Sequence, residues 1–231
     1  WEKYDLCEAI YAHFALAQAG PIVVINVFDP QKSKQKKTVS ETAANNQIIL
    51  GGMGGVILDS FAIEGKEKDV DYTLAYDYVT ERITVRGAHR GALAGTLSIS
   101  YEETTPGVTK EDVIGTTDGE GTDTGLYLIR RIYQETGKIP CRLLCPGTSH
   151  MPEVHEAMKG VCNQIGGHFD AFMLTDLLLQ GESGALTPSE AVAWKSEKGY
   201  AGDNEKTCWP RWSGNDGRMY HLSVLCAANL Q

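Results

Sequence analysis

Short apolar runs that alternate with helical stripes constrain the fold of this chain more than any other feature. The run Cys141–Cys145 (CRLLC) is followed by apolar residues at helical spacing between Pro152 and Ile165. A second run, Phe169–Thr175 (FDAFMLT), comes after that helix. Proline suits the first turn of a helix. Strands that alternate with helices form βαβ units with a parallel sheet, so the sequence predicts an α/β fold.

The start of the chain repeats this pattern in the opposite order. Residues 5–18 predict an amphipathic helix, with Asp5 and Glu8 as its capping box. Ile22–Phe28 (IVVINVF) follows, a nearly continuous apolar run rich in β-branched residues. Runs of this kind suit a strand that is covered on both faces, and we expect a strand here.

The end of the chain predicts one more helix and one more strand. Thr187 and Glu190 have the spacing of a capping box, which opens a short helix that Gly199 ends. Tyr220–Ala227 (YHLSVLCA) is again apolar, and we expect it to be the last strand.

The region between the two α/β segments has a different pattern. It starts with the polar, lysine-rich stretch Gln31–Lys37, which indicates a solvated loop. Several short segments then alternate apolar and polar residues with the period of a strand: Val56–Phe61, Leu74 and Tyr76, Ile83 and Val85, and Thr96–Tyr101. Short strands with glycines between them predict a small antiparallel barrel or sandwich.

Together these patterns predict two domains. The first is an open, mostly parallel, three-layer α/β domain formed by residues 1–30 plus 113–231. The second is a β-rich domain, residues 31–112, inserted after the first strand of the first domain.

The composition indicates a soluble globular protein and excludes two classes of partner. Hydrophobic residues make up 42% of the chain and the net charge is −9. An acidic surface disfavours nucleic acid, which needs a basic face. The longest apolar runs are much shorter than the ~20 residues of a membrane span. We therefore expect neither nucleic-acid binding nor membrane contact.

Polar residues follow the predicted strands at the edge where α/β proteins bind ligands. They are Asp29, Ser149, His150 and Asp176. An Asp–His–Ser set is the raw material of a hydrolase, so an α/β hydrolase or a nucleotide-using enzyme is one hypothesis. However, Ser149 lacks the Gly-x-Ser-x-Gly setting of such enzymes. The same residue types also form ordinary turns at strand ends.

The histidines and cysteines show no spacing typical of a metal site. Cys141 and Cys145 lie on one predicted strand, ~13 Å apart, which is too far for a disulfide. We expect free thiols, no metal ligands, no cofactor-binding residues and no cofactor.

Several segments resemble the central region of the contractile tail sheath proteins of phages and prophages. Their order and spacing match the family over most of the chain. The segments are Tyr4–Phe14, Gly20–Pro30, Asp71–Thr73, Ile99–Tyr101, Val113–Gly115, Thr124–Leu126, Gly137–Pro140, Cys145–His150 with the helix Pro152–Ile165, Phe169–Asp176, Trp209-Pro210 and Ser223–Ala228.

The resemblance implies a structural role. Sheath subunits stack as six-fold rings that wind helically around a tail tube. They contract on contact with the host and drive the tube into the cell envelope, the route of DNA injection and host cell entry. The family has no catalytic residues and needs no cofactor. Its members also carry a β-rich domain inserted in an α/β domain, as predicted here. The expected location is the virion, after assembly in the cytoplasm of the bacterial host.

The chain begins at Trp1 and stops at Gln231 directly after an apolar run, so we expect a fragment of a longer protein. The family's N-terminal arm and its C-terminal core domain are not represented. Because these parts hold sheath subunits together, we expect the piece itself to be monomeric. A third hypothesis is a binding module whose β-rich domain recognises a host surface.

Overall fold

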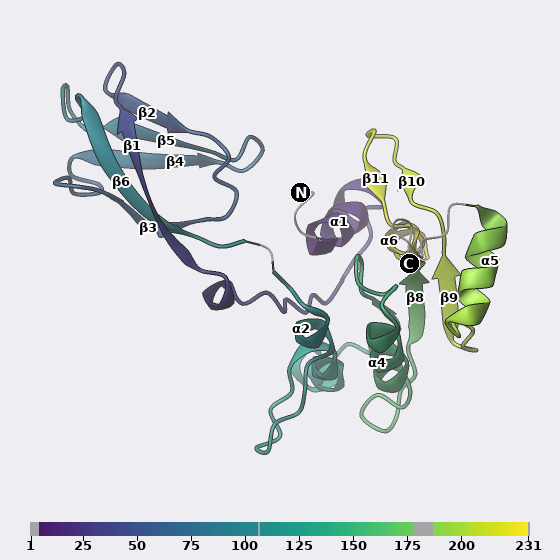
Figure 1. Ribbon diagram of the computed structural model, residues 1–231. Coiled ribbons are helices and arrows are strands. Elements are labelled where there is room, and N and C mark those ends of the chain that lie inside the picture. Colours follow the sequence, from purple (N-terminus) through teal and green to yellow (C-terminus); the bar gives the residue numbers. More distant parts are fainter. Residues whose placement is uncertain (1–4, 106, 178–186, 231) are drawn as a thin grey trace. The chain divides into compact units, whose positions relative to one another are not determined.

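The computed structural model describes residues 5–105, 107–177 and 187–230 (Figure 1). Contacts between residues divide the chain into two compact units. One combines Trp1–Val27 with Val108–Gln231 and is called the α/β unit below. The other, Phe28–Gly107, is called the β-rich unit. Along the sequence, the β-rich unit is therefore inserted within the α/β unit.

The β-rich unit consists of two three-stranded antiparallel sheets, with strand orders β1-β6-β3 and β2-β5-β4. Its elements are η2 (Pro30–Lys32), β1 (Gln35–Thr42), β2 (Gln47–Leu50), β3 (Val56–Ile63), β4 (Tyr72–Asp77), β5 (Arg82–Gly87) and β6 (Thr96–Glu103).

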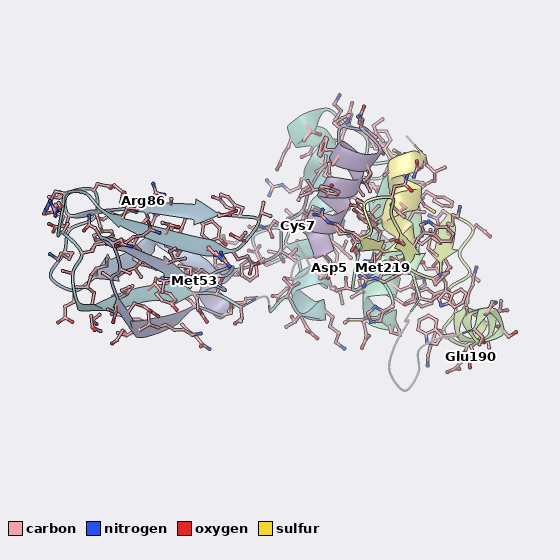
Figure 2. The ribbon with its side chains drawn as sticks, turned by 90° about the horizontal axis from the view of Figure 1, so that it is seen from above. Asp5, Cys7, Met53, Arg86, Glu190 and Met219 are labelled. Carbon is pink, nitrogen blue, oxygen red and sulfur yellow. The ribbon has the colours of Figure 1, made fainter. Side chains whose placement is uncertain are left out.

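Side chains from both sheets form one hydrophobic core. Phe61 and Ile99 come from the first sheet, Ile48 and Ile83 come from the second, and all four are buried. Met53, labelled in Figure 2, joins them from the connection between β2 and β3. The predicted strands in this region are confirmed. Of the two predicted forms, the closed barrel is wrong, because the described strands form two separate sheets.

The α/β unit contains helices and a parallel sheet, so the predicted α/β class is confirmed at this level. The sheet has the order β7-β8-β9, and both of its strand pairs are parallel. The elements are α1 (Asp5–Tyr11), the π-helical η1 (Ala12–Leu16), α2 (Lys110–Ile114), the 3₁₀ helix η3 (Gly125–Arg131), α3 (Ile132–Thr136), β7 (Arg142–Leu144), α4 (Pro152–Cys162), β8 (Phe172–Asp176), α5 (Pro188–Glu197), β9 (Glu205–Cys208), β10 (Trp212–Ser213), β11 (Met219–Tyr220) and α6 (Leu222–Asn229).

Local sequence signals place the helix starts. Pro152 occupies the first turn of α4, and Thr187 forms the predicted capping box with Glu190 at the start of α5. A further capping box, which the sequence analysis missed, joins Thr109 to Asp112 at the start of α2. Within the described residues, no helix is both long enough and apolar enough to cross a membrane.

The predicted strand Ile22–Phe28 is wrong, because the segment has no regular secondary structure. Val23 and Val24 are exposed, whereas Ile25 and Val27 pack against the core around Met158. An apolar run signals that side chains are buried, but a strand also needs a neighbouring backbone to pair with. In this segment, side-chain packing explains the apolar residues Ile25 and Val27, and no backbone pairing accompanies it.

The predicted last strand, Tyr220–Ala227, is also wrong. Only Met219–Tyr220 is a strand, and the chain then turns into helix α6. Ser223, Val224, Ala227 and Ala228 are buried, which is the stripe of a helix and not the alternation of a strand.

Two smaller expectations also change. The lysine-rich stretch Gln31–Lys37 is only partly a loop, because β1 begins at Gln35. Glu8 does not fold back as a capping residue, since its carboxylate binds His221 instead. All six cysteines lie in the described ranges as free thiols.

Candidate functional site

The candidate site lies where the three parallel strands end. β7 leads into the loop Cys145–His150, β8 ends at Asp176, and the chain beyond β9 reaches Arg211 and His221. Because the strands are parallel, their carboxyl ends share one edge of the sheet. This edge therefore collects most of the polar residues singled out from the sequence.

Ser149 and Asp176 are brought together here, but both serve the fold. The buried Ser149 hydroxyl accepts a hydrogen bond from the Asp176 backbone N–H at 2.9 Å. The Ser149 carbonyl accepts another from the Tyr200 hydroxyl at 2.9 Å. The Asp176 carboxylate accepts from the backbone N–H and the hydroxyl of Ser223, at the start of α6. Burial raises the pKa of Asp176, and these two bonds from Ser223 oppose the rise.

His150 is half-buried beside this group. Burial and the nearby His221 lower its pKa, while Asp176 and Asp5 act in the opposite direction. Its imidazole is therefore neutral at pH 7. Among the described contacts, His150 forms no hydrogen bond with Ser149 or Asp176. A nucleophilic serine needs a base that takes its proton, and the described residues do not assemble one.

Asp29, the fourth predicted residue, belongs to the β-rich unit. Its exposed carboxylate accepts a hydrogen bond from the Gln31 backbone N–H at 2.9 Å and caps the short helix η2. No strand precedes it, so the reason for placing it at a strand end is lost. Asp29 acts as a turn residue.

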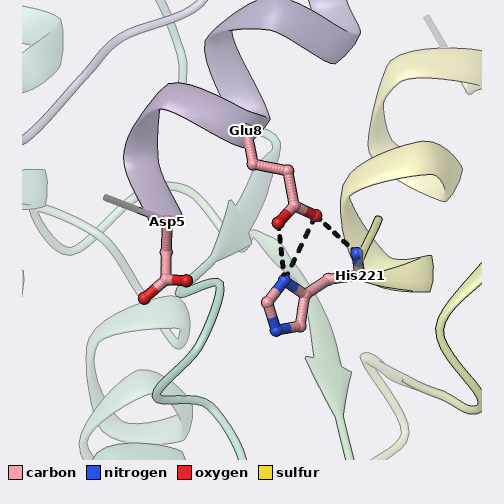
Figure 3. Close-up of side chains that lie close together, drawn as sticks. All are labelled: Asp5, Glu8 and His221. Carbon is pink, nitrogen blue, oxygen red and sulfur yellow. Dashed lines mark hydrogen bonds and ion pairs between the residues drawn. The ribbon is translucent and has the colours of Figure 1, made fainter. Parts of the chain in front are cut away.

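Glu8 and His221, which the sequence analysis missed as a pair, form the centre of a buried polar group (Figure 3). The His221 backbone N–H donates to Glu8 Oε1. The imidazole Nδ1 lies 3.1 and 3.0 Å from the two carboxylate oxygens. Helix α1 is thereby held to the start of α6, although 213 residues separate the two partners.

Arg211 adds a cation to this pair. Its Nη2 lies 3.2 and 3.3 Å from the two ring nitrogens of His221 and 3.7 Å from Glu8 Oε2. The Nε of Arg211 is buried and has no hydrogen-bond partner. Since 3.7 Å is beyond hydrogen-bonding distance, Arg211 balances the charge of Glu8 only in part.

Asp5 completes the group from the first turn of α1. It is exposed, and Figure 2 shows it near the start of the same helix that carries Cys7. Single ligand atoms of Asp5, Glu8 and His221 all lie within 4.8 Å of one another. The Asp5 carboxylate lies against Gly147, where an added Cβ would be 2.1 Å from Oδ2. Gly147 also has a φ of +76°, a backbone conformation that favours glycine.

A second histidine–carboxylate pair lies between α4 and β9. His155 Nε2 is 2.9 Å from Glu205 Oε1, and each side chain is only 1% exposed. The Thr175 hydroxyl donates to the same oxygen at 2.8 Å, and the Gly202 N–H donates to the other at 3.1 Å. Burial favours a higher pKa for Glu205, but these hydrogen bonds hold it below its ordinary value. The Tyr200 ring stacks on His155 at 3.8 Å.

Neither pair could be found from local sequence patterns. Glu8, His221 and Glu205 are separated from their partners by 50 residues or more. The usable signal was an acidic residue among apolar positions of a helix, as at Glu8, because a buried carboxylate needs a partner.

The two groups differ in what they offer chemically. The group of Asp5, Glu8 and His221 joins two buried side chains to one exposed carboxylate, whereas the side chains of His155 and Glu205 are both only 1% exposed. No protein-family model, no curated protein and no solved structure matches this chain.

Proposed function

We propose that this chain is part of a contractile tail sheath protein of a phage or prophage, a structural polymer subunit and not an enzyme. The observation that carries the proposal is the order of the segments that resemble this family. The part of Tyr4–Phe14 that is described forms α1 and most of η1, Cys145–His150 is the loop before α4, and Ser223–Ala228 lies in α6. A β-rich unit is inserted between the first of these segments and the others.

We further propose that the α/β unit is an open three-layer arrangement. Alternate residues of β8 have different partners. Thr175 hydrogen-bonds to Glu205, the partner of His155 on α4. The next residue, Asp176, binds Ser223 on α6. Because successive side chains of a strand point to opposite faces, this alternation supports a helix layer on each side of the sheet.

The strand-end polar groups favour a structural role over the hydrolase alternative. Ser149 is buried and accepts a backbone hydrogen bond, and Asp176 holds the first turn of α6. A catalytic serine would have to face a substrate and donate to a base. In the proposed role, these groups fix the loop after β7 and helix α6 to the edge of the sheet.

The proposed partners are other sheath subunits, in helically stacked six-fold rings, and the tail tube protein. The proposed location is the phage tail, assembled in the bacterial cytoplasm. Contraction of the polymer drives the tube through the host envelope. We expect the 231-residue piece to be monomeric, without affinity for nucleic acid or membranes.

Electron microscopy of the full-length protein, expressed with and without a tube protein from the same genome, tests the proposal. We expect extended or contracted tubes with six-fold rings, and no tubes from the 231-residue piece under the same conditions. Full-length protein that stays monomeric with the tube protein would contradict it. So would a hydrolase activity that Ser149→Ala or His150→Ala removes.

A further inference from the structure

Asp5, Glu8 and His221 combine the ligand types that transition metals select. Imidazole nitrogen suits Zn²⁺ and its neighbours, whereas Mg²⁺ and Ca²⁺ take oxygen ligands alone. Glu8 and His221 are 6% and 9% exposed, so burial holds them in place, and the exposed Asp5 leaves the group open to solvent. The set therefore combines two buried ligands with one exposed ligand, and Figure 3 shows the three side chains close together.

The spacing of the atoms is close to that of a metal centre. Zn²⁺ binds nitrogen and oxygen at about 2.0–2.2 Å, which in a tetrahedron sets the ligand atoms about 3.3 Å apart. His221 Nδ1 already lies 3.0 Å from Glu8 Oε2. The ligand atom of Asp5 is within 4.8 Å of the other two. A movement of up to about 1.5 Å by this exposed side chain would complete three coordination positions.

The loop after β7 lies against the Asp5 carboxylate, because a Cβ built at Gly147 would be 2.1 Å from Asp5 Oδ2. The same loop carries the half-buried His150, which interacts electrostatically with Asp5, Asp176 and His221. The loop therefore brings a further imidazole near the group.

The charges around the group also favour a cation. Glu8 is buried, and the Arg211 guanidinium reaches its Oε2 only at 3.7 Å. Buried carboxylates need a partner charge that is close, and a divalent ion between Asp5 and Glu8 would provide one.

We propose that Asp5, Glu8 and His221 form a Zn²⁺ site in which His221 binds through Nδ1 and water completes the coordination. Binding releases the Nδ1 proton to solvent, and the Arg211 guanidinium moves away from that nitrogen. The Arg211 side chain is 39% exposed, so its outer part has solvent to move into, although its Nε is buried. The ion would join α1 to the start of α6, two segments from opposite ends of the sequence.

Titration of the purified chain with ZnCl₂, followed by calorimetry and by metal analysis after dialysis, tests this site. We expect one equivalent to bind and to raise the unfolding temperature, because a ligand specific to the folded state stabilises it. Asp5→Asn should weaken binding by more than about tenfold while leaving the metal-free unfolding temperature unchanged. Asp5 is the deciding position, since its exposed side chain is not needed for the core.

Two control variants separate this site from adventitious binding. Cys7→Ser removes an exposed thiol from the same helix, and His89→Gln removes an exposed imidazole from the β-rich unit. Both should bind Zn²⁺ as tightly as the parent chain. The proposal is overturned if the parent chain binds no Zn²⁺, or if Asp5→Asn binds it as tightly as the two controls do.

Discussion

The two buried histidine–carboxylate pairs of the α/β unit have the same chemistry but different surroundings. Glu205 and His155 are each 1% exposed, and hydrogen bonds from Thr175 and Gly202 satisfy the remaining carboxylate positions. The side chains of Glu8 and His221 are slightly more exposed, and Arg211 Nη2 lies 3.7 Å from Glu8 Oε2 and 3.2 Å from His221 Nδ1. In the first pair, hydrogen bonds occupy both carboxylate oxygens of Glu205. In the second pair, the carboxylate of Glu8 has room for a closer cation than Arg211. The difference suggests that one pair fastens the fold and the other has room for a further role.

The largest effect is expected at the sealed pair. Glu205→Ala would leave His155, Thr175 and the Gly202 N–H without their acceptor inside the protein. We expect a loss of about 3–5 kcal/mol in the free energy of unfolding, measured by urea denaturation. The control Glu197→Ala, on the exposed side of α5, should change it by less than about 0.5 kcal/mol. If Glu205→Ala lowered the free energy of unfolding by less than about 1 kcal/mol, the pair would not be a main stabilising contact of the fold.

A smaller effect is expected at the open pair. Glu8→Ala removes the acceptor of the His221 backbone N–H, but solvent can compensate in part, because this pair is less deeply buried than Glu205 and His155. We expect a loss of about 1–3 kcal/mol in the same measurement. If Glu8→Ala cost more than Glu205→Ala, the ranking of the two pairs by burial would be wrong.

The two buried carboxylates with shifted pKa values, Glu205 and Asp176, should respond to acid in opposite ways. The folded-state pKa of Glu205 is lowered, so its contribution to stability is present above its ordinary pKa of 4.5 and is lost as the pH falls through the folded value. The folded-state pKa of Asp176 is raised above 3.8, so its contribution is present below 3.8 and is lost as the pH rises through the folded value.

Unfolding free energies measured between pH 7 and pH 3 separate these contributions. We expect Glu205→Gln to flatten the loss of stability in acid, because the variant no longer takes up a proton on unfolding at that site. Asp176→Asn should make the loss steeper, because it removes the opposing contribution. Parallel curves for the two variants and the parent chain would contradict both assignments.

The smallest effects are expected at the residues of the predicted enzyme site. Ser149→Ala deletes one hydrogen-bond acceptor and should cost about 1 kcal/mol. His150→Ala should cost less, since the described contacts give it no hydrogen bond. Neither variant should lose an activity in screens with esters or nucleotides, and a loss in either would support the hydrolase hypothesis.

Local patterns predicted more of the fold than of the candidate site. The alternation of apolar and polar residues identified the strands around Ile83 and Ile99, and the capping box identified the start of α5. The strand β9 (EKTC) was missed because its apolar content is low and its place comes from pairing with β8. The run Ile22–Phe28 was misassigned because hydrophobicity reports burial and not backbone pairing.

The site needed information that no local pattern contains. Ser149, His150 and Asp176 were predicted to meet because strand ends share an edge, and that topology holds. Their roles could not be predicted, because they depend on Ser223 and Tyr200, which approach from distant parts of the chain. Glu8 and His221 were missed for the same reason.

The distance in sequence between Glu8 and His221 also has a consequence for how the protein is made. At about 5–20 residues per second, the ribosome needs about 10–40 s to synthesise the 213 residues between them. The strands of the β-rich unit pair entirely within residues 35–103, so all of their partners exist before half of the chain has been translated. Helix α1, in contrast, waits with an unburied apolar face and a carboxylate that has no histidine. A chain truncated after residue 110 should therefore contain a folded β-rich unit behind an N-terminal segment that chaperones and proteases can still reach.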